Sequence, residues 1–210
     1  NSLSDTGRRS LQTAQRQTER MHDLIQGLLL LSQVESYRLA PDEGDRVSIT
    51  ELMVNVMAAL EKYADKERVI LELPENLFLL GVNIELEGIC INLVENALKY
   101  STPGTPIQVK WVETFRDEYV FSVEDQSSGI DPEDVPKITK RYYRGAKSRA
   151  ETTGSGLGLA IVQHAATKHG ATFLIESEPD KGSCFSVTFP SYRCLHDQKQ
   201  TARVIRLADY

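Results

Sequence analysis

The chain has 210 residues, 24 of them basic and 30 acidic, which gives a formal net charge of -6. This length buries a substantial core, roughly 70% of the surface that the unfolded chain exposes, and no apolar run reaches the roughly 18 residues of a membrane-spanning helix. The negative charge argues against nucleic acid or an anionic membrane as the main partner, so any phosphate site has to be a local basic cluster.

The first predicted element is a helix over residues 8–36, which contain no proline. Its apolar or small residues recur in steps of three and four, which is typical of a coiled-coil seam. Towards its C-terminal end leucines surround the helix, a pattern that favours burial in a bundle of several helices. The chain opens without Met and enters this pattern almost at once, so we expect it to be part of a longer protein.

A polar stretch at residues 40–46 interrupts the helical pattern and is predicted to be a linker between domains 1–39 and 47–190, with a tail at 191–210. The strands beyond the linker come in adjacent pairs joined by short polar turns. This pattern predicts an α+β fold, in which hairpins form a mixed sheet with helices on one face. The predicted helices are 50–66, 84–100 and 157–169, and the predicted strands are 69–73, 77–80, 107–115, 119–124, 172–176 and 183–189.

The helix at 84–100 is apolar around most of its circumference but keeps one polar stripe. Asn92, Asn96 and Lys99 lie in this stripe, within an arc of roughly 100°. Asn is a weak helix former, and exposed helix positions more often carry Glu, Lys or Gln. Two Asn one turn apart, roughly 6 Å along the axis, offer amide oxygens to a hard cation such as Mg²⁺, and Lys99 is placed to meet phosphate oxygens. A solvated helix face is the alternative explanation.

Asp125 follows the alternating strand at 119–124. It continues the apolar face formed by Tyr119, Phe121 and Val123. A carboxylate at the edge of an apolar pocket suits a flat heterocycle with an exocyclic amino group, such as adenine. The alternative is an Asp that only opens the turn after it.

A basic segment precedes a glycine-rich one. Residues 137–149 contain six basic residues and no acidic one, and Gly154, Gly156 and Gly158 follow at alternate positions before an apolar helix pattern. Glycines let a backbone approach a ligand closely, and a helix N-terminus presents free N–H groups to anions. The two segments predict a mobile basic lid next to a phosphate cradle. The glycine pattern is neither a Rossmann fingerprint nor a P-loop, and a solvated loop with a flexible turn is the alternative.

These motifs resemble, in order and spacing, the four boxes of the catalytic domain of sensor histidine kinases. They are Asn-Leu-Val-Glu-Asn-Ala-Leu-Lys-Tyr-Ser at 92–101, Asp-x-x-x-Gly at 125–129, Arg-Tyr-Tyr-Arg at 141–144 and Gly-Ser-Gly-Leu-Gly-Leu-Ala-Ile-Val at 154–162. Residues 19–35 resemble the second helix of the dimerisation hairpin of these kinases, so the resemblance spans about residues 8–190. Within the family the likeness is to the phosphate-regulon sensor kinases, because Thr139 stands where most members have Phe, and Ala-Ile-Val-Gln-His follows the glycine box.

The resemblance implies a Bergerat-type α/β sandwich that binds ATP and Mg²⁺, and it implies roles for individual residues. Asn96, helped by Asn92, would hold Mg²⁺, and both would act in catalysis together with Lys99. Tyr100 would lie near adenine, whose amino group Asp125 would bind. The remaining nucleotide-binding residues would be Gly129, Ile130, Arg141, Tyr143, Arg144, Gly154, Ser155, Gly156, Leu157 and Gly158.

The implied activity is transfer of the γ-phosphoryl group of ATP to a histidine on the dimerisation hairpin, for relay to an aspartate of a response regulator. The implied partners are a second copy of the chain, through the hairpin, and a response-regulator receiver domain. The implied location is a cytoplasmic domain of a bacterial protein that upstream segments anchor in the inner membrane. The family's phosphoacceptor motif, His-Glu-x-x-Thr-Pro, does not occur in these 210 residues, and the four histidines are interpreted as structural or exposed.

Two residues depart from the family pattern. The first glycine box normally reads Asp-Asn-Gly-Pro-Gly, whereas Ser127 places a side chain where the family has none, which is a potential source of weaker nucleotide binding. Thr139 removes an aromatic anchor from the start of the lid, which puts the docking of the lid in question.

Two alternatives to a kinase remain. ATP-hydrolysing members of the wider superfamily, such as gyrase, mismatch-repair and chaperone ATPases, carry a Glu four residues before the Mg²⁺-binding Asn, where it activates water. Asn92 occupies that place here and cannot take a proton, which favours phosphoryl transfer over hydrolysis. The second alternative is a degenerate nucleotide-binding scaffold. Ser127 is the reason to consider it, and Asn96, Lys99, Asp125 and the glycine loop argue against it.

Overall fold

The computed structural model describes residues 7, 10, 38–63, 65–145, 155–196 and 203–205 of the chain. Almost all of the predicted helix over 8–36 lies outside these residues. Residues 146–154 of the predicted lid and glycine segment, which include Gly154, also lie outside them. None of the helices in the described residues combines the length and the apolar character that crossing a lipid bilayer requires.

The strands in the described part of the chain are β1 (Asp45–Ser48), β2 (Val69–Leu73), β3 (Leu77–Gly81), β4 (Ile107–Glu113), β5 (Tyr119–Asp125), β6 (Thr172–Glu178), β7 (Gly182–Phe189), β8 (Cys194–His196) and β9 (Arg203–Ile205). They form a six-stranded sheet in the order β6-β7-β5-β4-β2-β9 and a three-stranded sheet in the order β1-β3-β8. β2 and β4 are parallel, whereas the other pairs in the large sheet are antiparallel. The predicted mixed sheet is therefore confirmed.

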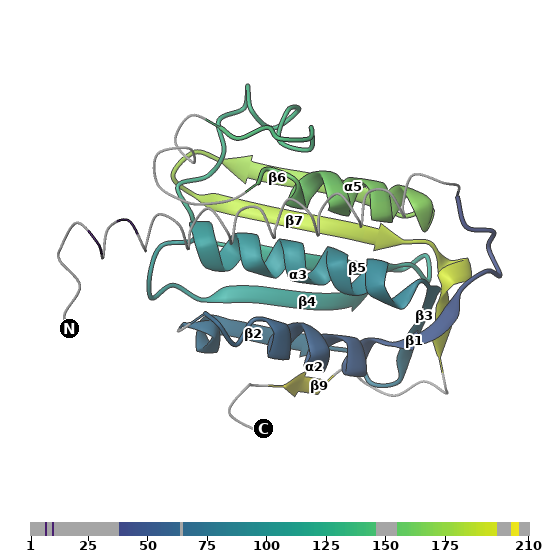
Figure 1. The fold of residues 1–210 in the computed structure, drawn as a ribbon. Coiled ribbons are helices and arrows are strands. Elements are labelled where there is room, and N and C mark those ends of the chain that lie inside the picture. The colour runs from purple at the N-terminus through teal and green to yellow at the C-terminus, as the bar shows by residue number, and fades with distance from the viewer. Residues whose placement is uncertain are drawn as a thin grey trace.

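Three helices in the described residues cover one face of the large sheet (Figure 1): α2 (Ile49–Ala59), α3 (Asn83–Tyr100) and α5 (Gly158–Lys168). α3 packs against β4 and β5, with α2 on one side of it and α5 on the other. This layering confirms the predicted α+β class. It also places the polar stripe of α3 beside the first residues of α5.

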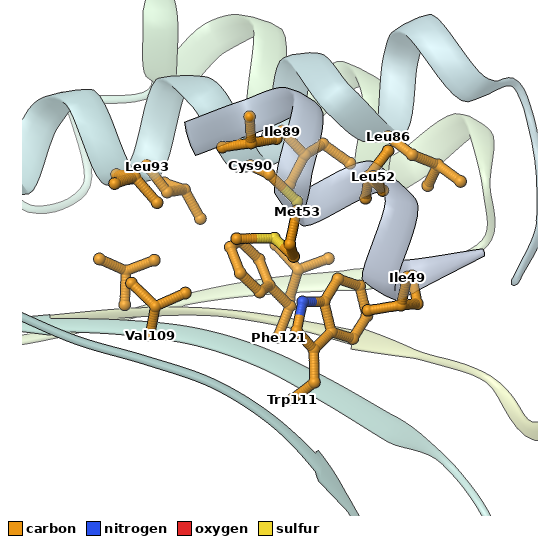
Figure 2. Packing of buried hydrophobic residues seen from close by; sticks show 14 of the residues in the cluster. Ile49, Leu52, Met53, Leu86, Ile89, Cys90, Leu93, Val109, Trp111 and Phe121 are labelled. Carbon is orange, nitrogen blue, oxygen red and sulfur yellow. The ribbon is translucent and has the colours of Figure 1, made fainter. Parts of the chain in front are cut away.

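Apolar side chains from the helices meet the sheet in one core. Figure 2 shows Met53 of α2 and Cys90 of α3 on the side of the helices that faces Trp111 of β4 and Phe121 of β5. The Trp111 and Phe121 rings have centroids 4.9 Å apart. Burying one such side chain stabilises the fold by roughly 1.5–3 kcal/mol, so the core holds α3 firmly against the sheet.

Several regions differ from the sequence prediction. The helix predicted over 50–66 ends at Ala59, because the buried residues at helical spacing stop at Leu60, and the 3₁₀ helix η1 (Lys66–Arg68) follows after a turn. β1 begins at Asp45, inside the predicted linker, and pairs along β3. The 3₁₀ helix η2 (Ser191–Arg193) and β8 lie in the predicted tail, and β8 covers the other edge of β3. Strands of only four and three residues, as β1 and β8 are, are too short to show an alternation that a sequence pattern detects.

Arg193 fixes the segment before β1 to the rest of the fold. Its guanidinium is fully buried and donates five hydrogen bonds, all to backbone carbonyl oxygens. The acceptors are Leu39 (2.9 Å), Ala40 (2.7 Å) and Glu43 (2.6 Å) of the segment, Leu80 (3.3 Å) of β3 and His169 (3.1 Å) after α5. Five donors in a rigid fork match this set of acceptors, which a Lys could not satisfy.

A buried charged cluster lies beside Arg193. Lys168 at the end of α5 pairs with Glu85 in the first turn of α3, with 2.6 Å between Nζ and Oε1. His169 accepts a hydrogen bond at Nε2 from the N–H of Val82 (3.0 Å), and its Nδ1 lies 2.8 Å from the carbonyl oxygen of Ala165. Burial lowers the pKa of His169 to about 4, so the ring is neutral at pH 7 and holds the loop in place. His169 therefore has a structural role.

Candidate nucleotide site

α3 presents the two predicted metal-binding amides near the start of α5. Nδ2 of Asn92 donates to the carbonyl of Gly88 at 2.7 Å, which fixes the amide and turns Oδ1 away from the helix axis. A Cβ atom built on Gly158 would lie 2.6 Å from this Oδ1, so Asn92 touches the first residue of α5. Asn96, one turn further on, is half-buried, and its side chain makes no hydrogen bond to any described residue. Its amide oxygen is thus available to a ligand.

α5 begins with free backbone donors. Its N-cap residue, Leu157, makes no side-chain hydrogen bond to the first turn, so the N–H groups of that turn point out of the helix without a cap. Gly156 adopts a left-handed backbone with φ +73°, and a Cβ there would lie 2.9 Å from backbone atoms of Tyr142 and Tyr143. The described part of the predicted phosphate cradle, residues 155–158, is therefore packed against the basic segment, where an anion would meet both.

Asp125 occupies the end of β5, as the sequence predicts. Its side chain is only 4% exposed, and Oδ1 is buried without a hydrogen-bond partner in the described structure. Burial raises the pKa of Asp125, while the Ser127 hydroxyl and the backbone N–H groups of Ser127 and Ser183 partly offset that rise. A buried acceptor without a donor is costly and rare, which is typical of a group kept for a ligand.

The loop after Asp125 is locked to the turn between β6 and β7. The N–H of Ile130 donates to the Ser177 hydroxyl at 2.8 Å, and the N–H of Asp180 donates to the carbonyl of Ser128 at 2.9 Å. Gly129 has φ +68°, and a Cβ there would lie 2.1 Å from the carbonyl oxygen of Glu178. The loop therefore keeps a fixed shape beside Asp125.

Replacing Gly129 with alanine should lower the free energy of unfolding by about 3 kcal/mol, because a left-handed Ala is strained and its Cβ would strike the Glu178 backbone. Chemical denaturation measures this loss. Gly104→Ala is the matched control, since Gly104 also has a positive φ of +81° but nothing lies within 4 Å of its added Cβ. The control should lose only about 1 kcal/mol. Equal losses in the two variants would contradict the close packing of the loop.

The basic segment reaches the glycine loop through its tyrosines. The N–H of Tyr142, which has a left-handed φ of 63°, donates to the carbonyl of Gly156 at 2.9 Å. The hydroxyl of Tyr143 donates to Asp134 at 2.7 Å. Arg141 is exposed and Arg144 is half-buried beside them. The basic segment thus places the guanidinium groups of Arg141 and Arg144 on either side of the two tyrosines, next to the glycine loop.

A family comparison agrees with this arrangement. Residues 81–193, more than half of the chain, match the family described as histidine kinase-, DNA gyrase B-, and HSP90-like ATPase. The chain belongs to this ATPase family. The matched region extends from the end of β3 to Arg193 and includes all the described candidate site residues.

Relatives that match the chain include sensor proteins and histidine kinases. The chain is 36% identical over 184 residues to the phosphate regulon sensor protein PhoR of Pseudomonas aeruginosa, covering 86% of this chain and 41% of PhoR. It is 31% identical over 201 residues to the sensor-like histidine kinase SenX3 of Mycobacterium bovis, covering 94% of this chain and 48% of SenX3. Full-length ShkA, solved in complex with AMPPNP, has a similar fold, with a TM-score of 0.67 at 20% identity over 90% of this chain and 40% of ShkA. The chain spans less than half the length of each, and it groups with the catalytic domains of two-component sensor histidine kinases.

Ser127, one of the two departures from the pattern of the histidine kinases, is accommodated locally. Ser127 avoids the left-handed backbone region, and its hydroxyl accepts a hydrogen bond from the N–H of Gly129 at 3.2 Å. Ile138, the neighbour of Thr139, packs against the core at the start of the basic segment. The effect of either residue on nucleotide affinity stays a prediction.

Lys99 belongs to a cluster that the sequence pattern did not reveal. Its Nζ lies 3.2 Å from Oε2 of Glu95. The other carboxylate oxygen, Oε1, accepts from the Tyr63 hydroxyl at 2.6 Å and lies 3.2 Å from Nζ of Lys62. Burial alone would raise the pKa of Glu95, but Lys99, Tyr63 and Lys62 outweigh it and hold the pKa below its ordinary value. Lys62 and Tyr63 come from the turn after α2, some thirty residues away, and no motif links them to the site. Tyr100 follows Lys99 and is 37% exposed.

Proposed function

We propose that this chain is the ATP-binding catalytic part of a sensor histidine kinase, which transfers the γ-phosphoryl group of ATP to a histidine on a dimerisation hairpin. The buried, unpartnered carboxylate oxygen of Asp125 is the observation that carries the proposal. The purine with an exocyclic amino group, adenine, supplies the donor that this oxygen lacks, whereas guanine presents a carbonyl at the same position and would repel it.

The residues around Asp125 fit the rest of the nucleotide. The uncapped N-terminus of α5 would hold phosphate oxygens, and Lys99, Arg141 and Arg144 would add positive charge. Asn96 and Asn92 would hold Mg²⁺ through their amide oxygens, which are the hard ligands that this cation prefers. When bound, Mg²⁺ supplies charge neutralisation at the phosphates. ShkA, whose complex contains AMPPNP, supports a nucleotide site in this fold.

Transfer is favoured over hydrolysis by the chemistry of Asn92. An amide cannot accept a proton from water at neutral pH, and Nδ2 of Asn92 is already committed to the carbonyl of Gly88. Among the described residues, no carboxylate takes its place at the contact between α3 and Gly158. The site therefore orients a nucleotide without activating water, which suits transfer to a side chain held in line by another domain.

The remaining features of the function rest on the relatives. Sensor kinases of the PhoR and SenX3 type support a two-component role. We propose that the whole protein forms a homodimer through the hairpin, that its partner is a response-regulator receiver domain, and that upstream segments anchor it in a bacterial inner membrane with this part in the cytoplasm. The boundaries 1–39, 40–46, 47–190 and 191–210 stay a proposal for its domains.

Phosphoryl transfer in trans tests the proposal. The chain is incubated with Mg²⁺, radiolabelled ATP and a separate hairpin carrying His-Glu-x-x-Thr-Pro, at hairpin concentrations raised until labelling saturates. Acid-labile label should appear on the hairpin. Asn96→Ala should reduce the labelling rate about a hundredfold or more, because losing metal charge stabilisation costs several kcal/mol.

Asn55→Ala is the matched control, since Asn55 lies on the exposed side of α2, and it should label like the parent chain. Release of free phosphate without label on the hairpin would indicate a hydrolase. Tight ATP binding with neither product would indicate a nucleotide-binding scaffold. Normal labelling by Asn96→Ala would remove this residue from the metal site.

A further inference from the structure

One carboxylate joins the turn after α2 to the lysine that the proposed function assigns to the phosphates. Oε2 of Glu95 lies 3.2 Å from Nζ of Lys99, one helical turn further along α3. Oε1 faces the other way, towards the Tyr63 hydroxyl at 2.6 Å and Nζ of Lys62 at 3.2 Å. Residues 62 and 63 precede residues 81–193, which match the ATPase family, so these two contacts reach the site from outside the matched region.

Tyr63 is held in place by its backbone and by the core. Its N–H donates to the carbonyl of Leu60 at 3.0 Å, which closes the turn after α2, and its half-buried ring packs against the hydrophobic core. The 2.6 Å distance to Glu95 is typical of a hydroxyl that donates to an ionised carboxylate. Because the Glu95 side chain is only 19% exposed, little water competes with the hydroxyl for Oε1.

The charges in this cluster favour a negatively charged ligand. Lys99, Tyr63 and Lys62 hold the pKa of Glu95 below its ordinary value although burial opposes them, so its carboxylate is ionised at pH 7. Two ammonium groups and one carboxylate leave a net charge of +1. The Lys62 side chain is 65% exposed and therefore well screened by water, whereas that of Lys99 is 23% exposed. A ligand would meet the excess charge most strongly at Lys99.

The division of the two carboxylate oxygens determines how Lys99 is held. An ammonium group has three N–H donors, so a single contact with Oε2 of Glu95 leaves two for a ligand. Tyr63 and Lys62 occupy Oε1, which keeps the carboxylate from turning both oxygens to Lys99. Around the axis of α3, Lys99 lies between Glu95 and the proposed metal ligand Asn96. The contact with Glu95 thus keeps the ammonium beside the site without using up its donors.

We infer that Tyr63 and Lys62 are positioning residues of the phosphate site, which act through Glu95 to hold Lys99 beside Asn96 with two N–H donors left for the phosphates of the nucleotide. The inference rests on the proposed function, because it deepens the role given there to Lys99. It adds to the site a turn that lies outside the four family motifs.

The test is calorimetric titration of the chain with ATP in the presence of Mg²⁺ and with adenosine, which has the base but no phosphate. Tyr63→Phe removes only the hydroxyl and should weaken ATP binding about three- to tenfold, because Glu95 then turns both oxygens towards Lys99. Adenosine binding should stay within about twofold of that of the parent. Lys62→Met should weaken ATP binding about twofold, since its charge is screened, and this exposed substitution leaves the core intact.

A double-mutant cycle identifies the group through which Tyr63 acts. Lys99→Met alone should weaken ATP binding about tenfold or more, and adding Tyr63→Phe should change the affinity by less than about twofold, because no ammonium is left to position. Tyr119→Phe is the matched control. It removes another tyrosine hydroxyl that donates to a glutamate, Glu113, at 3.0 Å, at the opposite end of β5 from Asp125. This control should bind ATP and adenosine like the parent.

The outcomes separate the two proposals. A parent chain that binds no ATP would contradict the proposed function, and the inference with it. A parent that binds ATP, together with a Tyr63→Phe variant that binds it equally well, would overturn only the inference. Equal losses of ATP and adenosine, or a loss on Tyr63→Phe that persists in full in the Lys99→Met background, would also overturn it, because Tyr63 would then do no more than support the fold.

Discussion

Replacing Asp125 with asparagine should weaken ATP binding roughly ten- to a hundredfold, because one hydrogen bond to a charged acceptor contributes about 1.5–3 kcal/mol. The variant keeps the size of the side chain and exchanges an acceptor pair for an amide, which can place an NH₂ group opposite the amino group of adenine. Calorimetric titration of parent and variant with ATP measures the loss. Preference for ATP over GTP should fall at the same time, since the carboxylate is the group that distinguishes the two bases.

The stability of the same variant separates recognition from folding. Burial raises the pKa of Asp125, so its ionised form costs folding free energy at any pH above the pKa of the unfolded chain. Asp125→Asn removes that cost, and the ligand-free variant should unfold at the same or a higher denaturant concentration than the parent at pH 7. The advantage should shrink as the pH falls through the raised pKa. ATP affinity equal to that of the parent would remove Asp125 from base recognition, and a strongly destabilised variant would contradict its unpartnered state.

Replacing Arg193 with methionine should lower the free energy of unfolding by about 4 kcal/mol. Methionine fills much of the volume but removes all five donors, and each buried carbonyl oxygen left without a donor costs about 1–3 kcal/mol before the structure relaxes. The carbonyl of Ala40 keeps the N–H of Glu43, 3.1 Å away, as a donor. The loss should fall on one region first, because three of the five acceptors lie in the segment before β1. Chemical denaturation measures the total, and hydrogen exchange at Leu39 to Glu43 locates it.

Arg116→Met is the matched control for Arg193. Arg116 lies in the exposed turn between β4 and β5, where its guanidinium contacts the ring of Phe115, which is 92% exposed. Its replacement should change stability by less than about 0.5 kcal/mol. A loss for Arg193→Met no greater than that of the control would show that the guanidinium does not hold the segment.

The elements that carry the site were predictable because their periodicity is strong. Apart from Glu87 near its start, the sequence pattern of α3 is apolar outside one polar stripe, and Asn92, Asn96 and Lys99 all lie in that stripe. β5 alternates without interruption, which placed Asp125 at its end. In both elements the buried side gives apolar residues at the period of the helix or strand, and this period is visible in the local sequence.

The parts that sequence reasoning missed depend on contacts between distant residues. Arg193 follows a predicted strand and has no distinctive neighbours, yet its five acceptors lie as far back as Leu39. Tyr63 and Glu95 meet only because α2 packs beside α3. Helix α2 and strand β4 end earlier in the structure than the sequence pattern predicts. Polar residues such as Glu61 and Thr114 form a turn as readily as they extend a helix or a strand.

Three serine hydroxyls beside Asp125, those of Ser127, Ser177 and Ser183, illustrate the same limit within the site itself. In the sequence, Ser127 places a side chain where the family has glycine, and the consequence expected from that alone is weaker nucleotide binding. Ser177 and Ser183 come from the two strands of another hairpin, and only the register of β5, β6 and β7 brings the three hydroxyls together. A departure from a motif is interpretable only with the residues that pack against it.

A crystal structure of this chain with Mg²⁺ and a non-hydrolysable ATP analogue tests the central claim most directly. One carboxylate oxygen of Asp125 should lie within about 3.2 Å of the exocyclic amino group of adenine, and the amide oxygen of Asn96 should lie about 2.1 Å from the metal ion. The phosphates should lie at the N-terminus of α5, beside Gly158. A nucleotide bound elsewhere, or bound with Oδ1 of Asp125 still unpartnered and no metal at Asn96, would contradict the account.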